Sequence, residues 1–256
     1  MTRVIKVGGR PQSDPALIKA LAAAHFANAP QDELVVIHGG GDEVSTLQKL
    51  YGVVAEFKGG RRVTSQTDID IIRMALSGSA NKRLVSALVS EGVPAIGLSG
   101  EDGGLLVATP LDFEQFGFVG VPAVVNRELL ARLLQNGMPV ISPVSRCSDE
   151  TLGQTLNVNG DDAAAAIAVA LKATDLLFVS DVEGVLKDGV PVSMLSPEDA
   201  QQLIDDGTAQ GGMSAKLQAA LKALEGGVER VRISDIAAIE QLDRGTVLTR
   251  VGSVCA

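Results

Sequence analysis

Two lysines lie at positions where a bound anion would explain them well. Lys6 stands inside an apolar segment that ends at Gly8 and Gly9. Burying a lysine in a strand is costly unless its ammonium group reaches an anion or the solvent. Lys216 follows a glycine pair at the expected start of a helix, although cations ordinarily favour the C-terminal end of the helix dipole. Lys6 could still reach solvent at the strand edge, but both positions favour anion binding.

A run of three glycines, Gly39 to Gly41, separates an apolar segment from a helical one. Glycines at such a place let the backbone approach a ligand closely and offer free N–H groups to an anion. A tight turn would explain one glycine better than three. The chain has neither a Gly-x-x-x-x-Gly-Lys-Ser/Thr loop nor a strand-linked Gly-x-Gly-x-x-Gly motif, so any nucleotide is held by another arrangement.

Three further clusters combine polar residues with glycine. The first, residues 58–64, is basic, and a solvated loop would explain it equally well. The second, 157–163, runs from a strand-like stretch into an alanine-rich helix, where Asp161 or Asp162 could cap the helix. The third, 180–186, follows a buried strand, and a turn would account for Gly184 but not for the whole set.

The elements that must position these residues alternate between strand and helix. Short apolar runs predict strands at 4–7, 34–37, 95–98, 140–141 and 176–179, and helical periodicity predicts helices at 14–27, 42–50, 68–91, 126–136 and 161–172. Such alternation implies a mostly parallel sheet covered on both faces. Ligands of open sheets bind beyond the carboxyl ends of the strands, so the first two glycine turns should share one crevice.

Two stretches depart from this alternation. Residues 52–64 and 103–121 are glycine-rich and suit β-hairpins, the latter with strands at 105–108 and 116–119. Hairpins over one end of the sheet would form a lid. We expect an N-lobe over residues 1–165 and a smaller C-lobe over 166–256, without a flexible linker.

Composition excludes several classes of function. The 256 residues are 46% hydrophobic but only 3% aromatic, which predicts an aliphatic core. No apolar run is long enough to span a membrane and no signal peptide is evident, so we expect a cytoplasmic protein. A net charge of −9 argues against nucleic acid as a partner. Cys147 and Cys255 have no paired spacing, which predicts reduced, structural thiols without a zinc site.

Six segments in order resemble the amino acid kinase family: Lys6 to Gly9, His38 to Gly41, Gly60 to Thr64, Asn157 to Asp161, Ser180 to Gly184 and Gly212 to Lys216. Each is weak alone, but six at family-like spacing cover nearly the whole chain. Arg62-Val63-Thr64 and Asn157-Val158-Asn159 are similar to the N-acetylglutamate kinases in particular. The resemblance implies an α/β fold, a three-layer αβα sandwich with a mainly parallel open central sheet and a β-hairpin lid over the substrate site.

The resemblance also implies roles for individual residues. Lys6 and Lys216 would stabilise a transferring phosphoryl group, and Asp161 would position both ammonium groups. Gly40, Gly41, Arg62 and Asn157 would bind an acyl amino acid, N-acetyl-L-glutamate, in the N-lobe. ATP would bind in the C-lobe with Mg²⁺ held mainly by phosphates and water, without a protein metal site; the residues implied are Gly8, Gly9, Ser180, Asp181, Val182, Glu183, Gly184, Val185, Leu186, Thr208, Ala209 and Gln210.

The residue inventory agrees with this chemistry. A γ-carboxylate with a pKa of about 4.3 is ionised at pH 7 and attacks ATP without a general base. Neither of the two histidines, His25 and His38, is needed. Phosphoryl transfer requires alignment and charge neutralisation, which lysines, glycine N–H groups and Mg²⁺ supply.

Two alternatives stay open at this point. One is a kinase for a carrier-protein-linked aminoadipate or glutamate in lysine biosynthesis, suggested by residues 97–100, although so acidic a chain would repel an acidic carrier unless Lys58, Arg61 and Arg62 formed a basic face. The other is a catalytically silent ligand-binding protein on the same scaffold, which has no need for paired lysines.

Departures from the family pattern are modest. Gly160 stands where alanine is commoner and could loosen the helix start, and Arg61 adds a charge beside Arg62. No helix precedes Lys6, and the resemblance links such a helix to arginine-inhibited hexamers. We therefore expect an uninhibited homodimer.

Overall fold

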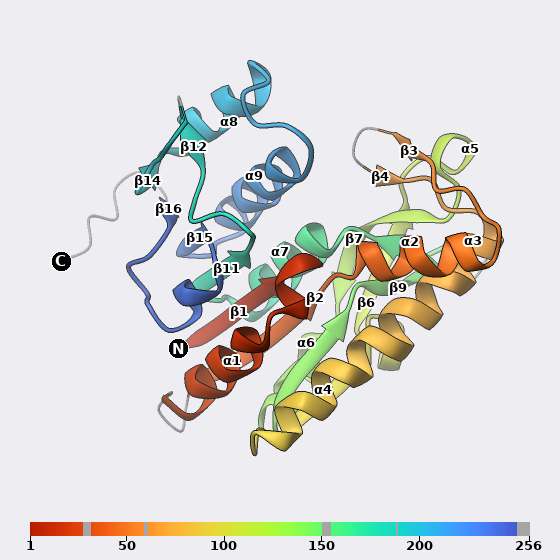
Figure 1. The fold of residues 1–256 in the computed structure, drawn as a ribbon, viewed down its shortest axis with the longest axis horizontal. Coiled ribbons are helices and arrows are strands. Elements are labelled where there is room, and N and C mark those ends of the chain that lie inside the picture. Colours follow the sequence, from red (N-terminus) through yellow and green to blue (C-terminus); the bar gives the residue numbers. More distant parts are fainter. Residues whose placement is uncertain (28–31, 59–60, 150–154, 188, 250–256) are drawn as a thin grey trace.

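The computed structural model describes residues 1–27, 32–58, 61–149, 155–187 and 189–249, and its elements form three layers (Figure 1). The middle layer is an eight-stranded sheet in the order β14-β16-β15-β11-β1-β2-β8-β5. All neighbouring strands are parallel except β15 and β16, so the predicted, mainly parallel sheet is confirmed. The strands are β1 (Thr2–Val7), β2 (Glu33–His38), β5 (Ala95–Ser99), β8 (Met138–Ser142), β11 (Asp175–Val179), β14 (Met194–Leu195), β15 (Arg230–Ser234) and β16 (Thr246–Thr249).

Helices cover both faces of this sheet (Figure 1). One face carries α1 (Pro15–Ala27), α4 (Asn81–Ser90) and the short η4 (Ile236–Ile239) over an aliphatic core. The other carries α6 (Arg127–Leu134), α7 (Gly160–Leu171) and α9 (Gly211–Glu225), with α8 (Pro197–Asp205) packed on α9. Within the described ranges, no helix combines the length and the apolar character that crossing a membrane requires.

The alternation of side chains along β1 determines where its lysine points. Successive strand residues face opposite sides of a sheet. Ile5 and Val7 pack into the core beneath α1 and α4, whereas Val4 packs on the opposite side. Lys6 shares the face of Val4, where the first turn of α7 crosses the strand ends. The lysine therefore points toward α7 although every neighbour of it in the strand is buried and apolar.

Two smaller β units stand beside the sheet. The hairpin of β3 (Phe57–Lys58) and β4 (Arg61–Arg62) confirms the prediction for residues 52–64, although Gly59 and Gly60 lie outside the described residues. A closed four-stranded barrel contains β6 (Leu106–Pro110), β7 (Val119–Val125), β9 (Val144–Cys147) and β10 (Thr155–Val158). Cys147 is a buried free thiol in this barrel, whereas Cys255 falls outside the described part of the chain.

The predicted hairpin at 103–121 is present, but the position of its second strand was wrong. Residues Phe113–Phe116 form a short helix, α5, and β7 begins only at Val119. The Asp112 side chain caps this helix by accepting a hydrogen bond from the Gln115 N–H, and Gly117 ends it with a φ of 66°. β6 and β7 also pair with β9 and β10, so this hairpin is part of the barrel.

The helical region predicted near 68–91 contains a π-helical segment. After α2 (Gly41–Leu50), the chain forms α3 (Gln66–Ile72), the π-helical η2 (Arg73–Ala80) and then α4 without interruption. Ser65 begins α3 with a capping box that includes Asp68. Short elements complete the fold: η1 (Arg10–Ser13), η3 (Asp102–Gly104), β12 (Leu186–Lys187) and β13 (Val190–Pro191).

A buried charge cluster joins three strands of the sheet. Asp175 at the start of β11 and Arg232 in β15 are both fully buried, 2.7 Å apart at their closest atoms. Arg230 donates to the same carboxylate at 2.9 Å, and Arg3 in β1 approaches it at 3.8 Å. One carboxylate is thus paired with three guanidinium groups at the end of β11 opposite the polar loops described next.

Candidate active site

Two ammonium groups meet one carboxylate beyond the strand ends. The Lys6 Nζ atom in β1 lies 2.7 Å from Asp161 Oδ1, and the Lys216 Nζ atom in α9 lies 3.8 Å from Asp161 Oδ2. Asp161 is held at the start of α7, where the Asn159 side chain caps the helix by accepting its N–H at 2.8 Å. Lys6 and Asp161 are 155 residues apart in the sequence, and Asp161 and Lys216 are 55 apart, yet all three meet at one buried centre.

The charges at this centre do not balance. Burial would raise the pKa of Asp161, but Lys6 and Lys216 outweigh it and hold the pKa below its ordinary value. Burial lowers the pKa of Lys216 by more than the nearby Asp161 raises it. Two cations share one carboxylate in a water-poor place, so an arriving anion gains strong electrostatic stabilisation there.

The glycine loops bring backbone close to the same point. Gly8 donates its N–H to Val179 O at 3.3 Å, and a Cβ atom on Gly8 would lie only 3.3 Å from that oxygen. A Cβ atom on Gly9 would lie 3.7 Å from the Gly41 nitrogen, so the two loops touch. Gly40 has a φ of 151°, and a Cβ atom there would lie 2.6 Å from Leu76 Cδ2. Only glycine fits at position 40 without strain.

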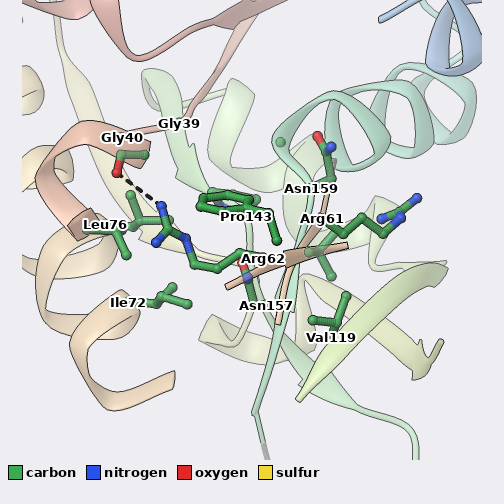
Figure 2. Close-up of a pocket in the computed structure, with 15 residues that line it drawn as sticks. Gly39, Gly40, Arg61, Arg62, Ile72, Leu76, Val119, Pro143, Asn157 and Asn159 are labelled. Carbon is green, nitrogen blue, oxygen red and sulfur yellow. Dashed lines mark hydrogen bonds between the residues drawn. The ribbon is translucent and has the colours of Figure 1, made fainter. Parts of the chain in front are cut away.

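A cavity of about 210 Å³ opens beside these glycines (Figure 2). Its floor is Gly39 to Gly41, and the β3–β4 hairpin covers it with Phe57, Arg61 and Arg62. The remaining wall is apolar or amide-bearing: Val44, Ile72, Leu76, Val119, Pro143, Asn157, Val158, Asn159 and Gly160. Two guanidinium groups, two side-chain amides and an aliphatic lining suit a small ligand that carries a carboxylate and a short apolar group.

Arg62 is held in place by one face of α2. Its guanidinium donates to Ser45 Oγ at 3.0 Å, to Gly41 O at 3.3 Å and to the Gln48 amide oxygen. Gln48 in turn donates to Asp68, the capping carboxylate of α3. Burial lowers the pKa of Arg62 more than the charge of Asp68 raises it, so this cation also favours an anionic partner. Asn157 on the opposite wall donates to Thr64 Oγ1 at 3.1 Å.

A second ion pair joins the hairpin to α7. Arg61 Nη2 lies 2.8 Å from Asp162 Oδ2, and Lys222 Nζ in α9 lies 3.4 Å from Asp162 Oδ1. The adjacent aspartates of α7 therefore serve different partners. Asp161 faces the two lysines, while Asp162 connects α7 to the hairpin and to α9.

Apart from Gly8 and Gly9, the residues predicted to receive a nucleotide lie in two loops. Residues 180–186 follow β11, where Ser180 donates to Ser234 O at 2.7 Å and Val185 donates to Thr246 Oγ1 at 2.8 Å. Asp181 in this loop is near enough to Lys216 that its charge offsets part of the lowering of the Lys216 pKa by burial. Thr208 to Gln210 precede α9, and Ala209 and Gln210 line a second cavity of about 360 Å³ that also reaches Asn159. Val185 is buried and Leu186 is exposed.

Sequence reasoning missed the residues that support the site from behind. Ser45 and Gln48 are three residues apart in α2 and so lie on the face that holds Arg62. That spacing was a usable signal, because a glutamine among core positions needs a polar partner. Ile72, the last residue of α3, and Leu76 in the π-helical η2 also line the cavity, and the sequence analysis named neither of them.

No group of three or more His, Cys, Asp or Glu side chains in the described ranges is arranged to hold a metal ion. The carboxylate nearest the two lysines, Asp161, is already engaged by both ammonium groups.

Comparison with known proteins accounts for this arrangement. The model for the amino acid kinase family matches residues 1–235. The chain is 44% identical over 249 residues to an acetylglutamate kinase of Chloroflexus aurantiacus, covering 96% of both chains. It is 41% identical over 238 residues to an acetylglutamate kinase of Geobacillus kaustophilus, covering 91% of this chain and 89% of that one. A solved structure from Streptococcus mutans superposes with a TM-score of 0.85 at 28% identity, over 97% of this chain and 98% of the other. The chain belongs to the amino acid kinase family.

Proposed function

We propose that this protein phosphorylates the γ-carboxylate of N-acetyl-L-glutamate with ATP, forming N-acetyl-L-glutamyl 5-phosphate in arginine biosynthesis. The observation that carries the proposal is the Lys6–Asp161–Lys216 centre beside a cavity that Arg62 enters. Relatives at 41% and 44% identity named acetylglutamate kinase support the choice of substrate.

In this proposal the cavity holds the acyl amino acid. Arg62 binds its α-carboxylate and Asn157 its N-acetyl-bearing end, while the apolar wall receives the methyl group. The γ-carboxylate then approaches Gly40 and Gly41, whose backbone N–H groups stand at the start of α2. No general base is required, since this carboxylate is ionised at neutral pH.

The lysines supply the charge that the reaction needs. Lys6 and Lys216 neutralise the oxygens of the transferring phosphoryl group, and Asp161 sets their positions. ATP would lie along Gly8, Gly9, residues 180–186 and 208–210, and Mg²⁺ arriving on its phosphates would add charge neutralisation. In this proposal the acyl amino acid binds in the lobe of residues 1–165, and ATP binds mainly in the lobe of residues 166–256, with Gly8 and Gly9 contributed by the first lobe.

The family likeness further supports a cytoplasmic homodimer in which the first lobe also makes the subunit contact. Light scattering coupled to size-exclusion chromatography measures the mass directly. A mass of twice 26.4 kDa is expected, and a monomer at assay concentrations would contradict the dimer.

The deciding experiment is Mg-ATP-dependent formation of acyl phosphate, trapped with hydroxylamine. N-acetyl-L-glutamate is compared with glutamate, aspartate and N-acetylaminoadipate. Selective product with N-acetyl-L-glutamate is the expected result, and no product with any of the four would refute the proposal. The same assay compares Lys216→Ala with a matched control, Lys222→Ala. Lys222 lies on the same helix, but its ammonium group pairs with Asp162 instead of Asp161.

A further inference from the structure

His38 ends β2 immediately before the glycine loop, and its ring is fully buried. Its Nδ1 atom lies 2.8 Å from the carbonyl oxygen of Gly39, and its Nε2 atom lies 3.1 Å from Asn81 Nδ2 at the start of α4. Asn81 is also fully buried. A buried pair of polar side chains between the sheet and a helix needs a reason, since each would be costly to leave unsatisfied.

The neighbours of Asn81 determine which ring nitrogen carries the proton. Asn81 Nδ2 donates to Val140 O at 2.9 Å, and its Oδ1 accepts from Lys82 Nζ at 2.9 Å. This orientation of the amide presents an N–H to His38 Nε2, which must therefore accept. The proton stays on Nδ1 and is donated to Gly39 O.

The ring also stays neutral. Burial lowers the pKa of His38 to about 4, and the hydrogen bond to Gly39 O offsets only part of this effect. Three cations act in the same direction as burial: Lys82 and Arg83 on α4, and Lys6 on β1. At neutral pH the histidine is thus one fixed tautomer that acts as a hydrogen-bond donor and not as a proton carrier.

The bond to Gly39 O has a consequence one atom further along the chain. In a trans peptide the C=O and the following N–H point to opposite sides of the plane, and the described residues contain no cis peptide bond. Holding Gly39 O against the His38 ring therefore directs the Gly40 N–H away from the ring. Gly40 lines the cavity, and with a φ of 151° and no side chain it has little intrinsic preference for one peptide orientation.

We infer that His38, oriented by Asn81, is a positioning residue that fixes the Gly39–Gly40 peptide so that the Gly40 N–H serves as an oxyanion donor. The inference rests on the proposed function, because the anion that Gly40 meets is the γ-carboxylate or the phosphoryl group. A histidine that merely filled the core would need its packing volume but not this donor.

Two substitutions separate the two contacts of the ring. In His38→Asn the side-chain amide reaches the place of Nδ1 and can still donate to Gly39 O. In His38→Gln the longer amide reaches the place of Nε2 and meets Asn81 instead. We expect kcat of His38→Asn within about threefold of the parent, and kcat of His38→Gln lower by about tenfold to a hundredfold, the scale at which misplacing a reacting group acts. KM for ATP should change in neither variant. Equal loss in both variants, or full activity of His38→Gln, overturns the inference.

A measurement without any change at position 38 tests the same geometry. His25→Gln leaves His38 as the one imidazole of the chain, so its ¹⁵N spectrum can be read directly. We expect an Nδ1–H tautomer that is unchanged between pH 5.5 and 8. An Nε2–H tautomer or a titrating ring overturns the inference. If the parent protein forms no acyl phosphate, the proposed function fails while the tautomer still decides this geometry.

Discussion

Replacing Gln48 with leucine should weaken the binding of N-acetyl-L-glutamate without slowing phosphoryl transfer. Gln48 is almost completely buried, and its amide joins Arg62 to Asp68. Leucine keeps the volume but removes both hydrogen bonds. A hydrogen bond to a charged group contributes about 1.5–3 kcal/mol. Arg62 keeps its contacts with Ser45 and Gly41, so we expect the loss in substrate binding to be about 1.4–2.8 kcal/mol, a tenfold to hundredfold rise in KM.

The effect should fall on KM because, in the proposed function, Arg62 binds the carboxylate that does not react. An interaction made equally in the ground state and the transition state changes KM and leaves kcat unaltered. Initial rates of acyl phosphate formation at varied N-acetyl-L-glutamate give both constants. Lys49→Ala, an exposed change on the same helix, is the control. A Gln48→Leu variant with lowered kcat and unchanged KM would show that Arg62 acts on the reacting end, and the assignment would be wrong.

Three further outcomes follow from the structure. Lys6→Ala or Lys216→Ala should lower kcat by about 100-fold or more, the scale of losing one transition-state donor; near-normal turnover in steady-state assays would refute their role. Asp175→Asn should cost about 3–5 kcal/mol in urea unfolding at pH 7 by leaving buried arginines uncompensated. The arginines hold the pKa of the Asp175 carboxyl low against the effect of burial. The contribution of this carboxylate to stability is therefore complete above about pH 4 and is lost as the pH falls toward the folded-state pKa. A loss of unfolding free energy in Asp175→Asn that is as large at pH 3 as at pH 7 would contradict this. Gly40→Ala should lower the melting temperature more than Gly41→Ala, because a Cβ atom meets Leu76 at position 40 and nothing within 4 Å at position 41; equal melting temperatures would be the contrary result.

The sequence predicted the sheet and the glycine loops at its strand ends because both depend on local patterns. Buried runs such as residues 34–37 and 176–179 have the length and composition of parallel strands. Glycines after these strands then mark where backbone must approach a ligand. The lysine at position 6 stood out because its neighbours are all apolar.

Features that depend on distant contacts were not predictable in the same way. The helix at Phe113–Phe116 results from a cap by Asp112 within a segment whose alternation suggested a strand. Strand β15 contains Arg232, which is buried only because Asp175 of another strand neutralises it. Helical periodicity predicted a helix over residues 68–91, but it did not distinguish the π-helical turns at Arg73–Ala80 from an α-helix. Single-sequence periodicity reports burial, not the partner that makes burial possible.

The adjacent carboxylates of α7 have a thermodynamic consequence. Asp161 holds the two lysines at the proposed phosphoryl centre, and Asp162, its direct neighbour, holds the hairpin that covers the cavity proposed for the acyl amino acid. Any displacement of this first helical turn is transmitted to both. Because one helical turn carries both carboxylates, we expect binding on one side to favour binding on the other, and linkage then makes the two effects equal in free energy. The nucleotide and the acyl amino acid should therefore bind cooperatively, with one helical turn as the mechanical connection between them.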